Sequence, residues 1–399
     1  MKVAVLTSFP SNPLAPSGGV EAVSVNLVGA LSRRPGLDVH VLTADRRCEA
    51  PAEQAWDGAT IHRLPMGSGK LLNYILGSGR VQMVRCLERL APDVIHTHDF
   101  YGMMVPGIAT PRVFTVHGFI HEDTRYSGGA LAWLRARVWR HYELAGWRRQ
   151  PHIISISPYV RERLRPLVPG VIHDIENPIA PEAFEIQRDE RTGTIFSAAA
   201  ISPRKNTLGL VRAFARVRQE CPGAMLRLAG PEPDGRYAQE VRRVIRESGL
   251  EAAVQWLGAL SAAGVREELA HASIFALPSF EEGAPMGVAE ALAAGVPVVT
   301  SNRCGMPFMV EQGRSGFLIE PEDEEEIAGR CLELLADHGL RQRMGMIGRQ
   351  FALERFHPDR VAERTEEVYR LAMGEPATAP RGAELSGATR GRTSGHDII

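Results

Sequence analysis

Two series of short apolar, β-branched segments alternate along the chain with longer segments of helical periodicity. The first series comprises KVAVLT, DVHVLT, DVIHTH, VFTVH and HIISIS, with helical periodicity over residues 21–33 and 131–149. The second comprises TIFSAAA, AMLRLAG, AVQWLG, SIFALP and VPVVTS. Strands that alternate with helices favour parallel sheets covered by helices on both faces. The sequence therefore predicts an α/β protein built from doubly wound, Rossmann-like sheets.

A segment without periodicity, DIENPIAPEAFEIQRDERTG, separates the two series. It is rich in proline and charge, which is typical of a linker. We expect an N-terminal Rossmann-like domain over residues 1–178, a linker over 179–190 and a C-terminal Rossmann-like domain over 191–356. In such sheets ligands bind at the carboxyl ends of the strands. A cleft is therefore expected where these ends of the two domains face each other.

The C-terminal part of the chain continues with helical periodicity and then loses it. PDRVAERTEEVYRLAM predicts an amphipathic helix, over residues 357–373, that crosses back to the first domain. Residues 374–399 are rich in Gly, Ala, Thr and Pro and lack an apolar face, which is typical of a disordered tail.

Charge and cysteine content exclude several classes of protein. The chain has 46 Lys and Arg against 47 Asp and Glu, so no strongly basic domain indicates nucleic-acid binding. The 5 cysteines are scattered and never in CxxC spacing, which indicates reduced thiols. The start MKVAVLTSFP lacks a secretory apolar region, and no apolar run approaches the ~18 residues of a membrane span. We expect a cytoplasmic protein.

Paired glycines, Gly18 and Gly19, follow the first predicted strand and precede a helix. Glycines at this place let backbone N–H groups approach a diphosphate, and the helix amino end adds partial positive charge. An ordinary strand-to-helix turn is the alternative interpretation.

His117 follows the strand VFTVH, where α/β folds place active-site groups. The alternative is a histidine whose hydrogen bonds are merely satisfied at a strand end. His96, His98 and Asp99 superficially resemble metal ligands, but no further ligand is predicted nearby. The chain also lacks a D-x-D motif that could hold a metal on a nucleotide diphosphate. We therefore expect no metal site.

Arg204 and Lys205 lie between a predicted strand and the start of a helix. Exposed surface charges are the alternative interpretation for either residue. Their position in the second domain directs them into the same cleft as the paired glycines. A departing diphosphate without a metal needs such cations.

The segment EEGAPMGVAEAL contains two glutamates, Glu282 and Glu290, separated by the opening of a helix. Carboxylates accept hydrogen bonds from vicinal hydroxyls, which suits a sugar ligand. Free backbone N–H groups at the helix start suit phosphate or sugar oxygens. The alternative is a capped, buried helix with a stray glutamate. The residues that open the helix are Gly283, Ala284, Pro285 and Met286.

LAWLRARVWRHYELAGWRRQ carries three tryptophans among five arginines. A basic, tryptophan-bearing helix can lie on an anionic membrane. In the alternative interpretation the tryptophans face the core and the arginines face water.

With glycines near the first strand, a histidine after the fourth, a lysine opening the second domain and Glu-x7-Glu near the end, the chain resembles the retaining GT-B glycosyltransferases of family four (glycosyltransferase group 1). The resemblance covers about residues 1–373. GMPFMVEQGRSGFLIEPEDEEEIA is also similar to the stretch that follows the Glu-x7-Glu motif in that family. The resemblance implies two Rossmann-like domains facing each other across a cleft, and a transfer that needs no cofactor or metal.

The same resemblance implies a role for each matching residue. Glu282 would contact hydroxyls of the donor sugar, Glu290 the nucleotide ribose, Lys205 the diphosphate, Gly18 and Gly19 the glycine turn, His117 the active site, and the backbone around Leu257 the nucleobase.

One departure from the family pattern concerns the diphosphate. The family pattern G-R-L-x-P-x-K is AAISPRK here, so Ala199 and Ala200 stand where a glycine and an arginine are usual. A charge-assisted contact is worth about 1.5–3 kcal/mol. We expect Arg204 to compensate. Cys304 also replaces the glycine usual before Gly305, which affects contacts with the donor sugar.

The sequence thus favours a retaining, metal-independent hexosyltransferase that uses a UDP-, GDP- or ADP-sugar. The acceptor would be a sugar, a lipid-linked saccharide or a small molecule, in polysaccharide or glycolipid assembly at or near the inner face of the membrane. Two alternatives stay open: a sugar-nucleotide epimerase or hydrolase, and a non-catalytic sugar-nucleotide-binding protein, which Ala200 favours.

Overall fold

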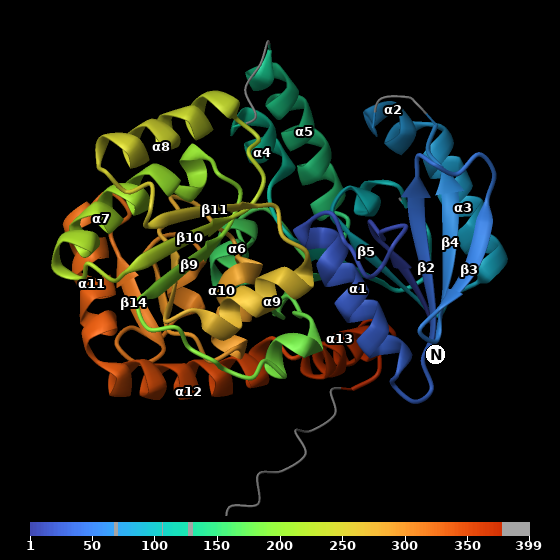
Figure 1. Cartoon of the computed structure of the whole chain (residues 1–399). Coiled ribbons are helices and arrows are strands. Elements are labelled where there is room, and N and C mark those ends of the chain that lie inside the picture. Colours follow the sequence, from blue (N-terminus) through green and yellow to red (C-terminus); the bar gives the residue numbers. More distant parts are fainter. Residues whose placement is uncertain (68–70, 106, 127–130, 377–399) are drawn as a thin grey trace, which may run out of the picture.

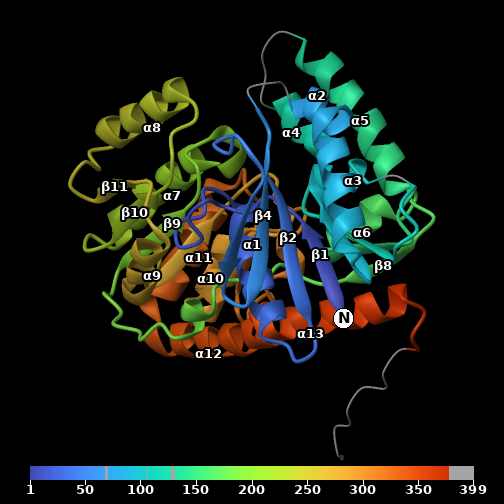
Figure 2. The same ribbon diagram turned by 90° about the vertical axis from the view of Figure 1, so that its right-hand side faces the viewer.

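Two β-sheets lie side by side, and helices cover each of them (Figures 1 and 2). This computed structural model describes residues 1–67, 71–105, 107–126 and 131–376. The predicted C-terminal tail lies outside the described residues from 377 onward. Within the described part of the chain, no helix combines the length and apolarity that crossing a membrane requires.

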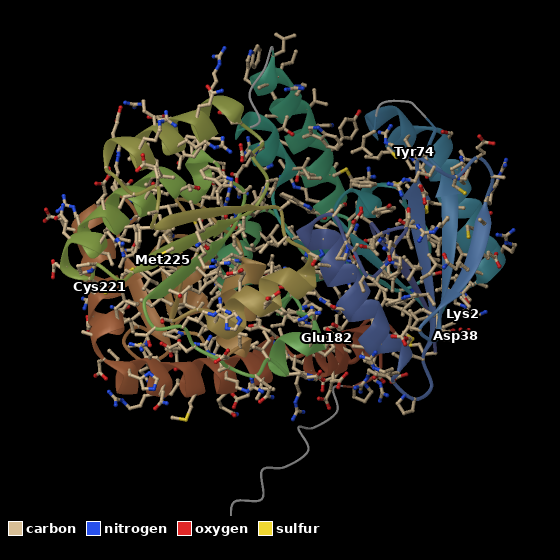
Figure 3. All side chains as sticks on the ribbon, in the orientation of Figure 1. Lys2, Asp38, Tyr74, Glu182, Cys221 and Met225 are labelled. Carbon is tan, nitrogen blue, oxygen red and sulfur yellow. The ribbon has the colours of Figure 1, made fainter. Side chains whose placement is uncertain are left out.

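The first sheet has 8 strands in the order β3-β4-β2-β1-β5-β6-β7-β8. Its strands are β1 (Lys2–Leu6), β2 (Asp38–Asp45), β3 (Ala52–Trp56), β4 (Ala59–Pro65), β5 (Val94–His98), β6 (Arg112–Val116), β7 (His152–Ser155) and β8 (Val171–Asp174). Its helices are α1 (Gly19–Ser32), α2 (Leu71–Leu76), α3 (Ser78–Leu90), α4 (Ile120–Tyr126), α5 (Ala132–Trp147) and α6 (Pro158–Leu164). Lys2 and Asp38 pair at the amino ends of β1 and β2, and Figure 3 labels both residues.

The edge strand β3 departs from the expected parallel arrangement because it runs antiparallel to β4. Asp57 and Gly58 connect the two strands with φ angles of 45° and 82°. Positive φ at both central residues is characteristic of the tight hairpin turn that Asp-Gly favours. The hairpin therefore has a local signal, which the search for strand-helix alternation does not detect.

The second sheet has 6 strands in the order β11-β10-β9-β12-β13-β14, and all of its paired strands are parallel. The strands are β9 (Thr194–Ala198), β10 (Met225–Ala229), β11 (Val254–Gly258), β12 (Ile274–Leu277), β13 (Val298–Ser301) and β14 (Gly316–Ile319). The helices are α7 (Thr207–Glu220), α8 (Gly235–Glu247), α9 (Ala262–His271), α10 (Met286–Ala293), α11 (Glu324–Ala336) and α12 (His338–Arg355). Short 3-10 turns precede α7 (η3, Pro203–Lys205) and follow β13 (η4, Met306–Phe308).

The final helix, α13 (Pro358–Ala372), packs against α1 and β6 rather than against the second sheet (Figures 1 and 2). Its residues Val361, Val368 and Tyr369 are buried in the same apolar cluster as β1 and α1. The chain connects the two sheets twice, near Ile179 and near Phe356. These two segments lie together, because Ile179 N–H donates to the carbonyl of Phe356 at 3.1 Å. The core of the first sheet is therefore completed by the end of the described chain.

Candidate active site

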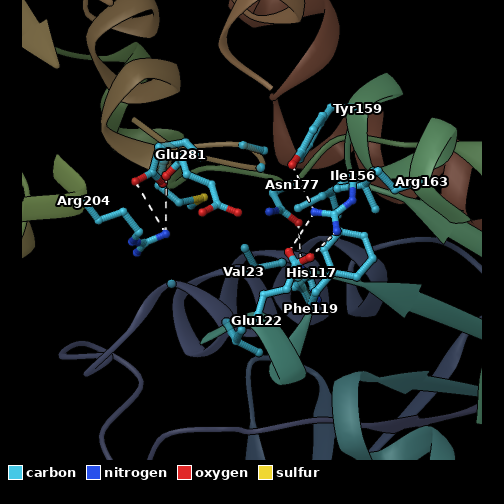
Figure 4. Close-up of a pocket in the computed structure, with 18 residues that line it drawn as sticks. Val23, His117, Phe119, Glu122, Ile156, Tyr159, Arg163, Asn177, Arg204 and Glu281 are labelled. Carbon is cyan, nitrogen blue, oxygen red and sulfur yellow. Dashed lines mark hydrogen bonds and ion pairs between the residues drawn. The ribbon is translucent and has the colours of Figure 1, made fainter. Parts of the chain in front are cut away.

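A pocket of about 220 Å³ lies between the two sheets, at the carboxyl ends of their strands (Figure 4). One wall comes from the start of α1, the segment after β6, the start of α6 and Asn177. The other wall comes from η3 and the loop between β12 and α10. Figure 4 shows Arg204 and Glu281 on one side, and Asn177, Tyr159 and Arg163 on the other.

Seven residues singled out from the sequence line this pocket: Gly19, His117, Arg204, Glu282, Gly283, Ala284 and Met286. The other five lie outside its lining. Gly18 and Pro285 are the N-cap residues of α1 and α10. Lys205 reaches the pocket through its ion pair with Glu282. Glu290 lies farther along α10, and Leu257 in β11 packs against an apolar cluster of the second sheet.

The amino end of α1 faces the pocket, since Gly19, Val20 and Val23 line it. A Cβ added to Gly18 or Gly19 would meet no atom within 4 Å. The paired glycines thus leave open space above the first-turn N–H groups, which have no partner within the helix. The helix N-cap also lacks a side-chain hydrogen bond. An anionic ligand could occupy this space.

Glu282 is only 7% exposed although it lines the pocket. Its carboxylate forms an ion pair with Lys205, and Arg204 Nη1 lies 3.8 Å from the same Oε1 atom. Arg204 Nη1 also donates to the carbonyl of Glu281 at 3.4 Å. A carboxylate with this burial requires such partners. The three side chains therefore form one charged cluster on the wall from the second sheet.

The loop that carries Glu282 is held by close backbone contacts. Gly305 N–H donates to the carbonyl of Glu282 at 2.8 Å, and a Cβ on Gly305 would lie 1.8 Å from the carbonyl oxygen of Gly283. Ser157 Oγ, at the N-cap of α6, donates to that same Gly283 carbonyl at 2.9 Å. The loop is thus fixed from both sides of the pocket.

His117 lies in the pocket, but the protein engages both of its ring nitrogens. Nε2 is 2.8 Å from His98 Nδ1, and Nδ1 is 3.1 Å from Asn177 Oδ1. An amide oxygen only accepts, so His117 carries its proton on Nδ1 and accepts from His98 at Nε2. Burial lowers the pKa of His117 and lowers that of His98 well below its usual value. His117 is therefore a neutral, oriented imidazole at neutral pH.

His96 lies beside His98, with 4.4 Å between ring centroids. Its ring nitrogens contact Tyr369 Oη and Thr115 Oγ1, both at 2.7 Å, so α13 reaches this cluster. Burial lowers the pKa of His96 to about 3. Among the residues that the structure describes, no group of three or more His, Cys, Asp or Glu side chains could hold a metal ion.

The buried His96 predicts acid sensitivity. Its folded-state pKa of about 3 lies below the 6.5 of an unfolded chain, so the unfolded state takes up the proton first as pH falls. Its contribution to the free energy of unfolding is present above pH 6.5 and falls by about 2 kcal/mol between pH 7.5 and 5. Urea unfolding at both pH values measures this loss. The free energy of unfolding should decrease from pH 7.5 to pH 5 by about 2 kcal/mol less in the His96→Gln variant than in the wild type.

The variant is compared with the wild type because other buried groups also change the pH dependence of stability, and they do so in both proteins. Burial raises the pKa of Asp99 and raises that of Glu290 to about 7, so these two carboxyls favour the fold as pH falls. Their effects cancel in the difference between the two proteins. An equal pH-dependent change in wild type and variant would contradict the assignment.

Two α/β sheets with a charged pocket at the facing ends of their strands define the GT-B class of glycosyltransferases. Comparison with known proteins identifies the family. Residues 17–183 match the family model described as Glycosyltransferase Family 4, and residues 179–351 match that described as Glycosyl transferases group 1. The chain belongs to this family of retaining glycosyltransferases, which transfer a sugar from a nucleotide sugar, as its motifs predicted.

The chain is similar to an alpha-maltose-1-phosphate synthase from Mycobacterium tuberculosis, with 27% identity across 93% of this chain and 99% of that protein. A GDP-mannose-dependent alpha-(1-6)-phosphatidylinositol monomannoside mannosyltransferase of the same organism is 28% identical, across 55% of this chain and 61% of that protein. The solved structure of a sucrose-phosphate synthase from Thermosynechococcus elongatus gives a TM-score of 0.78 at 20% identity, across 94% and 99% of the two chains. The predicted GT-B fold is confirmed.

Proposed function

We propose that this enzyme transfers a hexose from a nucleoside diphosphate sugar to an acceptor hydroxyl, with no metal ion in the transfer step. The observation that carries the proposal is the pocket between the sheets, where the amino end of α1 faces the cluster of Glu282, Lys205 and Arg204. Positive groups on both walls could bind the leaving diphosphate, and a carboxylate in the same pocket could bind sugar hydroxyls.

In this proposal the leaving diphosphate is stabilised by Lys205, Arg204 and the free N–H groups at the amino ends of α1 and α10. Arg204 would supply the charge that the family pattern places at Ala200. Support comes from its position, because its side chain lines the pocket and is 43% exposed. Fixed positive groups at a departing anion lower the barrier because they need no reorganisation.

The donor sugar would contact Glu282, and the ribose would contact Glu290. Burial raises the pKa of Glu290 to about 7, and hydrogen bonds from ribose hydroxyls would favour its charged form. The backbone near Leu257 would face the nucleobase. His117, oriented by His98 and Asn177, would shape the space beside the reacting carbon, and acceptor attack on the face vacated by the diphosphate would retain the anomeric configuration.

We assign the enzyme to the cytoplasm, with polysaccharide or glycolipid assembly as its setting. All 5 cysteines are free thiols, which suits a reducing compartment. The acceptor would approach from the side of the first sheet.

A panel of UDP-, GDP- and ADP-linked glucose and mannose tests the proposal. One nucleotide class should raise the melting temperature by several degrees at a concentration far above its Kd, because it binds only the folded state. With an acceptor, the same donor should give a product of unchanged anomeric configuration, equally in EDTA. Sugar release or isomerisation without an acceptor would instead indicate a hydrolase or epimerase, and binding without turnover a binding protein.

A further inference from the structure

The first part of α5 and the residue before it expose a cluster of large apolar side chains. Eight such side chains are prominently exposed in the described chain, and half of them are Leu131, Trp133, Leu134 and Val138. Trp133 is 65% exposed. This end of the helix projects beyond both sheets in Figures 1 and 2. Apolar side chains gathered in this way mark an interaction surface, whereas single exposed ones do not.

The same stretch is positively charged. Residues 131–142 contain Arg135, Arg137 and Arg140 and no Asp or Glu, and all three arginines are exposed. Among the described residues, Arg137 and Arg140 have no ion-pair partner. The next acidic residue, Glu143, is buried and already accepts backbone hydrogen bonds from the start of α4 at 2.7 and 3.0 Å. The positive charge of Arg137 and Arg140 is therefore available to an external anion.

A crevice of about 510 Å³ runs beneath this surface, between α4, α5 and α6. Its walls combine aromatic, aliphatic and basic side chains: Phe119, His121, Glu122, Trp133, Ala136, Arg137, Arg140, Leu144, Trp147, Arg163 and Leu167.

The crevice adjoins the active-site pocket, because Phe119, Glu122 and Arg163 line both. Arg163 stacks 4.0 Å above the ring of Phe119, and its Nη1 lies 2.7 Å from Glu122 Oε2. These three side chains form the partition between the two spaces. A molecule held in the crevice would therefore lie next to the reacting sugar.

We propose that α5 docks the enzyme on an anionic lipid surface, and that the crevice takes an acceptor with a negatively charged head group from it. Arg137 and Arg140 bind the head group, and the exposed apolar side chains enter the lipid. Basic helices that carry tryptophan bind such surfaces through these two contributions. The inference rests on the proposed transfer reaction, to which it adds the class of acceptor.

Cosedimentation with vesicles tests the docking surface. The protein should bind vesicles of phosphatidylcholine mixed with phosphatidylglycerol, and not vesicles of phosphatidylcholine alone. Tryptophan emission should shift to shorter wavelength on binding, and the shift should decrease sharply in Trp133→Phe. The Arg137→Gln/Arg140→Gln variant should bind about tenfold more weakly or worse, since each arginine near an anionic surface contributes several-fold.

Matched controls lie on α12 and α13, which are at the opposite end of the molecule from α5 (Figures 1 and 2). Arg343→Gln/Arg360→Gln removes the same charge from exposed positions, and Met346→Ser removes an exposed apolar side chain from the same end. These controls should bind vesicles like the wild type. A thermal shift with the donor nucleotide verifies that every variant is folded.

Equal binding to both vesicle types, or undiminished binding of the arginine variant, would overturn the inference. Displacement from the vesicles by inorganic phosphate at low concentration would also overturn it, because it would indicate a site for the free anion. Sedimentation does not depend on turnover. An active transferase that does not bind vesicles therefore refutes only this inference. A protein that binds vesicles but never turns over donor refutes the proposed function, and with it the acceptor role of the crevice, but not the docking surface.

Discussion

Replacing Gly305 with alanine should lower turnover at least a hundredfold, whereas Gly329→Ala should leave it unchanged. The added methyl would lie 1.8 Å from the carbonyl oxygen of Gly283, so the loop bearing Glu282 must move. Displacement of a positioned group by about 1 Å costs on the order of a hundredfold in rate. Gly329 is a matched control, because a Cβ there meets nothing within 4 Å and its helix α11 contributes no residue to the pocket lining.

Steady-state rates with a saturating donor provide the measurement, and circular dichroism shows whether both variants keep the fold. The contact lies between two backbone segments, so no flexible side chain can give way. A Gly305→Ala protein with near wild-type kcat would show that the position of the Glu282 loop does not govern catalysis.

Replacing Lys205 with alanine should lower kcat by about a hundred- to a thousandfold, the range seen when one positioned donor to a developing anion is removed. Arg204→Ala should cost about tenfold, because its more exposed charge is screened by solvent. Arg212→Ala serves as the control, since Arg212 lies on α7 and pairs with Glu324 at 3.5 Å, away from the pocket lining.

A double variant separates catalysis from stability at this cluster. Lys205→Ala leaves the buried Glu282 without its closest cation, so the melting temperature should also fall. Adding Glu282→Gln should restore part of that stability but not the rate. Wild-type kcat in Lys205→Ala, or recovery of kcat in the double variant, would contradict a direct role for the ammonium group. Unchanged donor affinity and turnover in Arg204→Ala would refute its compensation for Ala200.

Much of the fold could be predicted because its strongest signals are local. Ten strands were predicted from apolar runs between helical segments, among them β1, β9 and β12. β14 was missed because Gly316–Ile319 begins with a glycine directly after a turn, and β8 was missed because Val171–Asp174 has no fully buried residue. The β3 and β4 hairpin was missed because an exposed edge strand, AEQAW, carries little apolar pattern.

The site could be predicted only as far as each segment carries its own chemistry. The loop from Glu282 to Met286 was identified from its residues, and most of it lines the pocket. Asn177 and Ser157 were missed because their importance arises only when distant segments meet. Asn177 orients His117, and Ser157 holds the Gly283 carbonyl. Neither contact leaves a periodic or compositional trace in the sequence.

The helix α13 has a consequence for biosynthesis. A ribosome makes the amino-terminal lobe first, but Val361, Val368 and Tyr369, which close its apolar interior, are translated only after the whole second lobe. While the nascent chain grows, that lobe remains open, whereas the carboxy-terminal lobe already has every strand it needs. Maturation of the two lobes should therefore run opposite to their order of translation, which makes the first lobe the part that chaperones shield longest.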